Sequence, residues 1–123
     1  GIDYGEKRVG VAISDEDGKM AFPFDVLSND KRLIQRLAEI CKREKIEKIV
    51  FGESKDLAGK DNPLMETARE VFSTIKKKIG LPVVWEPEFF TTAEAERLQG
   101  KHGMLDASAA AIILTSYLTK LKS

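Results

Sequence analysis

The sequence predicts an α/β fold in three layers, in which a mixed five-stranded sheet carries helices on both faces. The 123 residues are enough for one hydrophobic core and too few for two. Apolar residues recur with period two in the first quarter of the chain and with the helical period after it. Strands and helices then alternate, and right-handed crossovers would place their strands parallel in one sheet. We therefore expect a single domain over residues 1–123 with the order β-β-β-α-β-α-β-α.

The first part of the chain is predicted to form three consecutive antiparallel strands. A short strand at 1–5 is followed by alternating apolar segments at 9–13 and 21–27, and the acidic turn 15–18 separates the last two. Pro23 cannot donate to a sheet ladder, so the third strand should lie at an edge. Because the chain opens at the edge of a strand, we also expect a few preceding residues to extend that strand.

The remainder alternates between helices and strands. The first expected helix begins after residue 30 and has an apolar stripe on one face at 33–41. Further helices are expected at 64–79, 91–98 and 106–121, and strands at 46–52 and 81–85. Asn62 before Pro63 is a typical helix start, and Gly80 ends that helix. Thr91 and Glu94 fit the capping box of the short helix.

The composition is that of a soluble protein without export or membrane signals. No apolar run approaches the roughly 20 residues that span a bilayer, and no signal peptide is visible. A reducing cytoplasm is therefore the expected compartment. Cys41, the single cysteine, falls on an apolar helical stripe and is predicted to be a small buried hydrophobe. The formal net charge is zero, so a contact with nucleic acid would have to come from a local basic patch.

Asp3 is the most informative residue, because it places a carboxylate inside a strand that should be buried. Such a group costs several kcal/mol unless it is paired, hydrogen-bonded or bound to a metal. Glu88 is expected just past the fifth strand and Asp106 at the start of the last helix. In α/β sheets, ligands gather at the carboxyl ends of the parallel strands, so the three acids could meet at one edge.

Converging carboxylates repel one another, and divalent cations relieve that repulsion. Mg²⁺ or Mn²⁺ held by Asp3, Glu88 and Asp106 could activate a water for attack on a phosphodiester. Each of the last two acids also has a plainer interpretation. Glu88 could be a solvated loop residue, and Asp106 could be only the N-cap of the final helix.

Basic residues in loops could ring the same edge and attract a phosphate backbone. They are Lys7, Arg8, Lys55, Lys60 and Lys101. His102 lies between glycines in an exposed loop, where a solvated side chain is the default and a phosphate contact is the sharper hypothesis. The three lysines at 76–78 are more simply explained as the solvated end of a helix.

In these motifs the chain resembles the YqgF (RuvX) family, which is described as a pre-16S rRNA nuclease or Holliday junction resolvase-like family with an RNase H-like fold. The resemblance spans nearly the whole chain and rests on 1–12, 49–52 with Gly59 and Pro63, Glu88 ahead of 91–95, and 106–110. It implies metal-binding acids at Asp3, Glu88 and Asp106. It also implies an endonuclease that acts on structured nucleic acid, above all in 5′ maturation of pre-16S rRNA.

The chain departs from the family pattern at two places. Pro87-Glu88-Phe89 stands where the family usually has Asp-Glu-Arg, and Glu53-Ser54 follows Gly52 where Leu-Pro is usual. Three alternatives therefore stay open beside rRNA maturation. One is a nuclease of branched DNA, which would act as a homodimer on a two-fold symmetric junction. The others are a non-catalytic ribosome-assembly module and a nucleotide-binding protein similar to actin-like ATPases, which normally need two such domains.

Overall fold

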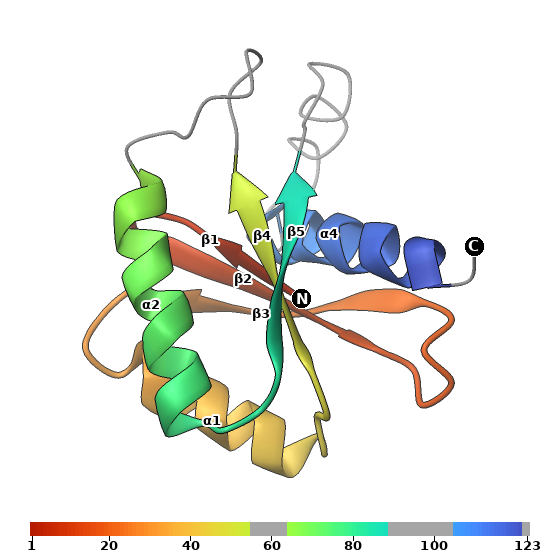
Figure 1. Ribbon diagram of the computed structural model, residues 1–123, viewed down its shortest axis with the longest axis horizontal. Helices are drawn as coiled ribbons and strands as arrows, with labels where there is room; N and C mark the ends of the chain where they lie inside the picture. Colours follow the sequence, from red (N-terminus) through yellow and green to blue (C-terminus); the bar gives the residue numbers. More distant parts are fainter. Residues whose placement is uncertain (55–63, 89–104, 122–123) are drawn as a thin grey trace.

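The computed structural model describes residues 1–54, 64–88 and 105–121, and these ranges contain the mixed sheet expected from the sequence (Figure 1). The strands are β1 (Ile2–Tyr4), β2 (Arg8–Ser14), β3 (Ala21–Ser28), β4 (Ile49–Ser54) and β5 (Val83–Glu88). The helices are α1 (Leu33–Arg43), α2 (Leu64–Lys78) and α4 (Leu105–Leu121). The sheet order is β3-β2-β1-β4-β5. β2 runs antiparallel to β1, whereas β4 and β5 run parallel to it, as predicted.

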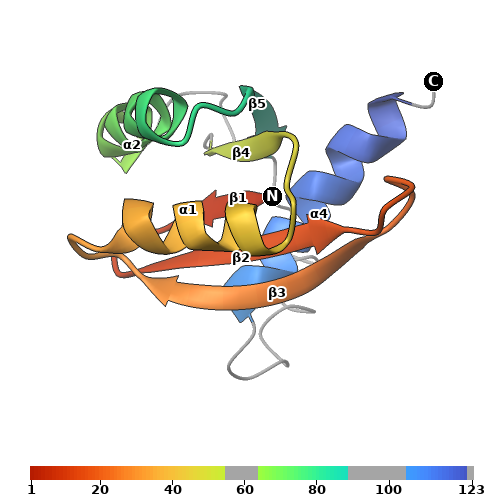
Figure 2. The same cartoon turned by 90° about the horizontal axis from the view of Figure 1, so that it is seen from below.

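Helices cover both faces of the sheet (Figure 2). Under α1 and α2 lies the larger core cluster, whose fully buried side chains include Phe51, Met65 and Ile75. The smaller cluster lies under α4 and includes Ala110 and Ile113. The period-two alternation of the strands supplies both clusters, because successive side chains point to opposite faces. None of the helices in the described ranges has the length and apolar character to cross a lipid bilayer.

The strand ends differ from the predicted ones. β4 begins at Ile49 rather than at 46, and β5 continues to Glu88 rather than ending at 85. Glu88 is thus the last residue of the strand and not a loop residue beyond it. The parallel ladder with β4 extends β5, since it pairs Glu53 with Pro87 and then Ser54 with Glu88. Pro87 is tolerated there because β5 is an edge strand.

Several smaller expectations are confirmed. β3 is the other edge strand and contains Pro23. Trp85 packs against the core and stacks on Phe72, with ring centroids 4.4 Å apart. Cys41 is half-buried against the same cluster, and burial raises the pKa of its thiol, which disfavours the reactive thiolate. The predicted short helix at 91–98 and the predicted helix start at 62–63 lie outside the described residues.

Gly80→Ala is expected to lower the free energy of unfolding by about 1 kcal/mol. Gly80 follows α2 with φ of +78°, a left-handed conformation that an L side chain adopts only at a cost. A Cβ there would meet no atom within 4 Å, so the loss is conformational and not steric. Urea denaturation measures it, with Lys78→Ala on the exposed last turn of α2 as the control. Equal stability of Gly80→Ala and the wild type would contradict this account.

Candidate metal site at the carboxyl edge of the sheet

Asp3 is a half-buried carboxylate in the middle of β1, between the buried side chains of Ile2 and Tyr4. Those two neighbours pack into the cluster under α1 and α2, so alternation turns Asp3 toward the face that α4 covers. Its partner in the ladder with β2 is Gly10, and Gly52 is its neighbour on β4. Neither glycine has a side chain, so the sheet leaves space on both sides of the carboxylate.

α4 begins at the same edge of the sheet (Figure 1). It touches β1 at Gly1, where a Cβ would lie 2.7 Å from the carbonyl oxygen of Ala110. Asp3 lies two residues after Gly1, which is about 6 Å along the strand. Asp106 lies about one turn before Ala110, which is also about 6 Å along the helix. The other end of α4 lies at the opposite edge, where Tyr117 accepts a hydrogen bond from the segment before β4. The backbones of Asp3 and Asp106 therefore lie on the same side of the Gly1–Ala110 contact.

Glu88 ends β5 at this edge, where the ladder pairs it with Ser54. β4 lies between β1 and β5, and the row of Asp3 contains Glu86. Glu88 therefore lies two strand spacings, about 10 Å, across the sheet from Asp3 and two residues, about 7 Å, further along it. Asp106 is the second residue of α4 and not its N-cap. The side chains of Glu88 and Asp106 lie outside the described part, and the described side chains contain no group of three metal ligands. The convergence of the three carboxylates on a cation thus stays a prediction.

The donor set fits a hard divalent cation. Asp3, Glu88 and Asp106 would offer only carboxylate oxygens, which suit Mg²⁺ or Mn²⁺ better than softer metals. Asp3 is half-buried, and its ladder partner Gly10 has no side chain to compete for the space beside it. The chemistry of these three residues thus fits the predicted metal.

The predicted nucleic-acid contacts are placed at this edge in part. Lys7 lies in the turn between β1 and β2, Arg8 opens β2, and both are exposed. Gly5 is the first residue of this turn. A Cβ there would lie 2.5 Å from the carbonyl oxygen of Arg8, so the turn requires glycine. The remaining predicted contacts lie outside the described residues: Lys55, Lys60, Lys101 and His102.

Glu86 is a buried acid beside the candidate site that the sequence patterns did not single out. Its side chain is only 3% exposed, and it accepts hydrogen bonds from Lys120 Nζ at 2.6 Å and from Ser116 Oγ at 2.9 Å. In the ladder it lies opposite Gly52, in the same row as Asp3. These bonds dock α4 onto β5. The available signal was a charged residue at a core-facing strand position, together with two polar residues spaced i, i+4 on one helix face.

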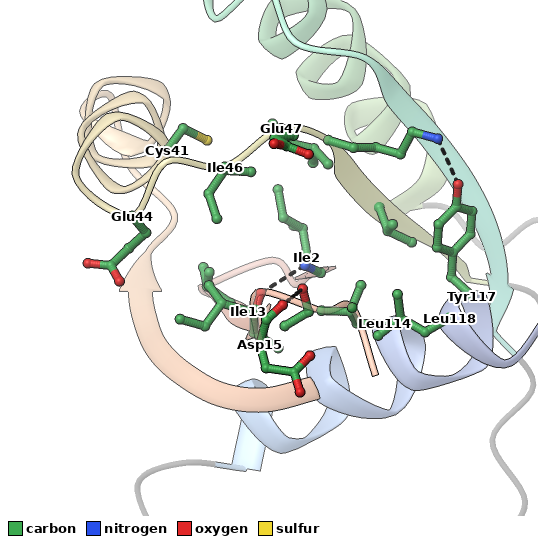
Figure 3. A pocket seen from close by; sticks show the side chains of 18 of the residues that line it. Ile2, Ile13, Asp15, Cys41, Glu44, Ile46, Glu47, Leu114, Tyr117 and Leu118 are labelled. Atoms are coloured by element: carbon green, nitrogen blue, oxygen red, sulfur yellow. Dashed lines mark hydrogen bonds between the residues drawn. The ribbon is translucent and has the colours of Figure 1, made fainter. Parts of the chain in front are cut away.

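A separate cavity of about 660 Å³ lies at the opposite edge, at the amino end of β1 (Figure 3). Its lining is mixed. The apolar residues include Ile2, Ile13, Ile46, Leu114 and Leu118, and the acidic residues Asp15, Glu44 and Glu47 also line it. The backbone nitrogen of Gly1 donates a hydrogen bond to the carbonyl oxygen of Ala12 at 2.8 Å, which continues the pairing of β1 with β2 at this edge. At the cavity wall Lys48 Nζ donates to the Tyr117 hydroxyl at 2.9 Å. This cavity is distinct from the edge that carries Asp3.

Comparisons with known proteins agree with the fold. The chain matches the family model "RuvX: Holliday junction resolvase" over residues 1–120. A relative from Desulforudis audaxviator, named "Putative pre-16S rRNA nuclease", is 32% identical over 133 positions that cover 100% of this chain and 94% of the relative. A relative of the same name from Streptococcus agalactiae serotype III is 34% identical, and the match covers 98% of this chain and 96% of the relative. The Fowlpox virus resolvase, solved with its substrate Holliday junction DNA, has a TM-score of 0.60 at 12% identity, covers 99% of this chain and 97% of its own, and shows the RNase H-like fold.

Proposed function

Because the chain belongs to the RuvX family, we propose that it is a divalent-metal-dependent endonuclease of structured nucleic acid that acts in 5′ maturation of pre-16S rRNA. The observation that carries this proposal is the placement of Asp3. A half-buried carboxylate lies between two glycines, at the edge to which β5 and α4 bring the backbones of Glu88 and Asp106. The names of the relatives support the RNA substrate, whereas the family description supports branched DNA as the second candidate.

The residues of this edge would divide the work of phosphodiester hydrolysis. Asp3, Glu88 and Asp106 would hold Mg²⁺ or Mn²⁺, which when bound lowers the pKa of a water and stabilises the leaving oxygen. Lys7 and Arg8 would hold the phosphate backbone next to the cut bond, and we assign Lys101 and His102 the same role. Lys7 and Arg8 follow Asp3 within five residues of the sequence, across the turn that begins at Gly5.

Removal of divalent metal is expected to stop cleavage completely. The assay uses an RNA that carries the 5′ precursor segment of 16S rRNA and, in parallel, a four-way DNA junction. EDTA should abolish the cutting of whichever substrate is cleaved, and added Mg²⁺ or Mn²⁺ should restore it, because the carboxylates cannot activate a water without a cation. Cleavage that persists in excess EDTA would rule out the metal mechanism.

The same assay separates the proposed nuclease from a non-catalytic module. Such a module would bind RNA without metal and would leave both substrates intact at every metal concentration. Paired symmetric cuts in the junction, together with a dimer in sedimentation, would favour the branched-DNA reading over rRNA maturation.

A further inference from the structure

The segment between β3 and α1 lies next to the turn between β1 and β2, because the ladder pairs Arg8 at the start of β2 with Ser28 at the end of β3. Asn29 ties the two together, although it is 24 positions from Gly5. Its Nδ2 donates to the carbonyl oxygen of Gly5 at 2.9 Å and to that of Glu6 at 3.2 Å. Its backbone N–H donates to the carbonyl oxygen of Lys7 at 3.0 Å. These bonds hold the two loops in one arrangement at the carboxyl edge of β1.

Three cations on these loops form a surface that we name the corner patch: Lys7, Lys31 and Arg32, all exposed. Asp30 lies among them, and its charge interacts with those of Arg32 and Arg36. Its carboxylate accepts the backbone N–H of Arg32 at 2.9 Å and lies 3.2 Å from Arg36 Nη1. The bond from the Arg32 N–H is the main reason that the pKa of Asp30 is lowered. Within the described ranges, the three side chains of the corner patch form no ion pair.

The charge around the corner patch differs from that of the whole chain. The full sequence has no net charge, whereas segments 6–8 and 29–36 together hold five basic residues and two acidic ones, a local net charge of +3. This excess begins close to the candidate site. Arg8 lies two residues before Gly10, the ladder partner of Asp3, which is about 7 Å along the strand.

We infer that the corner patch binds the phosphodiester backbone of the nucleic acid on the β2–β3 side of the candidate metal site. The inference rests on the proposed function and extends it, because it gives the substrate a path past Asp3 toward the start of α1. Lys and Arg side chains on an open surface suit contacts to phosphates, which position a nucleic acid without reading its sequence. A chain with no overall charge excess can bind a polyanion in this way, because the two segments at this corner carry a local excess of positive charge.

A double variant, Lys31→Ala with Arg32→Ala, tests the corner patch. Binding is measured by fluorescence anisotropy in EDTA, where no metal-dependent cleavage occurs, with an RNA duplex bearing a 5′ single-stranded extension and with a four-way DNA junction. We expect affinity to fall about tenfold at 0.1 M salt, and the slope of log K against log[salt] to become shallower by about 1 to 2. The matched control is Lys77→Ala with Lys78→Ala on the exposed end of α2, which should bind like the wild type.

Asn29→Ala separates the arrangement of the loops from their charge. This variant removes the two Nδ2 bonds and keeps every cation. Binding should weaken by about threefold because the loops are no longer pre-organised. The salt slope should stay at the wild-type value, since no phosphate contact loses its charge.

The outcomes distinguish the corner patch from the proposed function. Wild-type affinity and salt slope in the Lys31/Arg32 variant would overturn the corner patch and leave the metal-dependent nuclease standing. Reduced affinity together with cleavage in EDTA would overturn the metal mechanism and keep the corner patch. A loss confined to the RNA or to the DNA probe would show which backbone the surface binds, and failure of the wild type to bind either probe would overturn the inference.

Discussion

Asp3→Asn is expected to reduce Mg²⁺- or Mn²⁺-dependent cleavage by about a thousandfold or more while leaving the protein folded. Asparagine keeps the size of the side chain and removes the charge that would hold the cation. The half-buried position has glycine neighbours on β2 and β4, so the sheet should accept the substitution without strain. The loss should therefore appear in activity and not in the fold.

Two measurements check this expectation. Cleavage rates are compared in Mn²⁺, and melting temperatures are compared with and without Mn²⁺. A bound cation stabilises the native state, so Mn²⁺ should raise the melting temperature of the wild type and not that of Asp3→Asn. Asp17→Asn, on the exposed turn after β2, is the matched control and should behave like the wild type in both. Undiminished cleavage by Asp3→Asn would remove Asp3 from the mechanism.

The other two predicted ligands extend the same test. Glu88→Gln and Asp106→Asn should each lose cleavage and the Mn²⁺-dependent rise in melting temperature. Full activity in either variant would exclude that residue from the metal site. Loss of cleavage in all three single variants would support a shared cation. When residues act as one unit, the removal of any one of them costs nearly as much activity as the removal of all.

Lys120→Met is expected to lower the free energy of unfolding by about 2–3 kcal/mol. Glu86 is only 3% exposed and would keep Ser116 as its hydrogen-bond donor but lose its ion-pair partner. An uncompensated buried charge is costly. The Lys120 side chain is itself 62% exposed, so water can approach the pair, and the loss should fall below that of a fully buried pair.

A double-mutant cycle measures the contribution of this pair to stability. The variants are Lys120→Met, Glu86→Gln and the combination, compared by urea denaturation. The combination should be more stable than Lys120→Met alone, because it leaves no buried charge without a partner. Lys42→Met, on the exposed last turn of α1, is the control for losing a surface lysine. A Lys120→Met protein as stable as this control would show that the ion pair does not dock α4.

Local patterns in the sequence predicted most of the fold. The switch from period two to the helical period predicted where the described strands and helices lie. A strand or helix that buries one face needs apolar residues at a fixed spacing, and this spacing is visible in the local sequence. Pro23 identified an edge strand and Gly80 a helix end, because each restricts the backbone at its own position. Asp3 stood out for the same local reason, a charge in an apolar strand.

Features that depend on distant partners could not be read in this way. β5 reaches Glu88 because β4 offers a ladder to extend it, and Glu86 is buried because α4 supplies Lys120 and Ser116. The corner patch exists because Asn29 ties together two loops far apart in sequence. Local sequence patterns thus predict which elements form and which acid is unusual for its strand. The partner of each polar group follows from the packing of distant segments, and local periodicity carries no information about that packing.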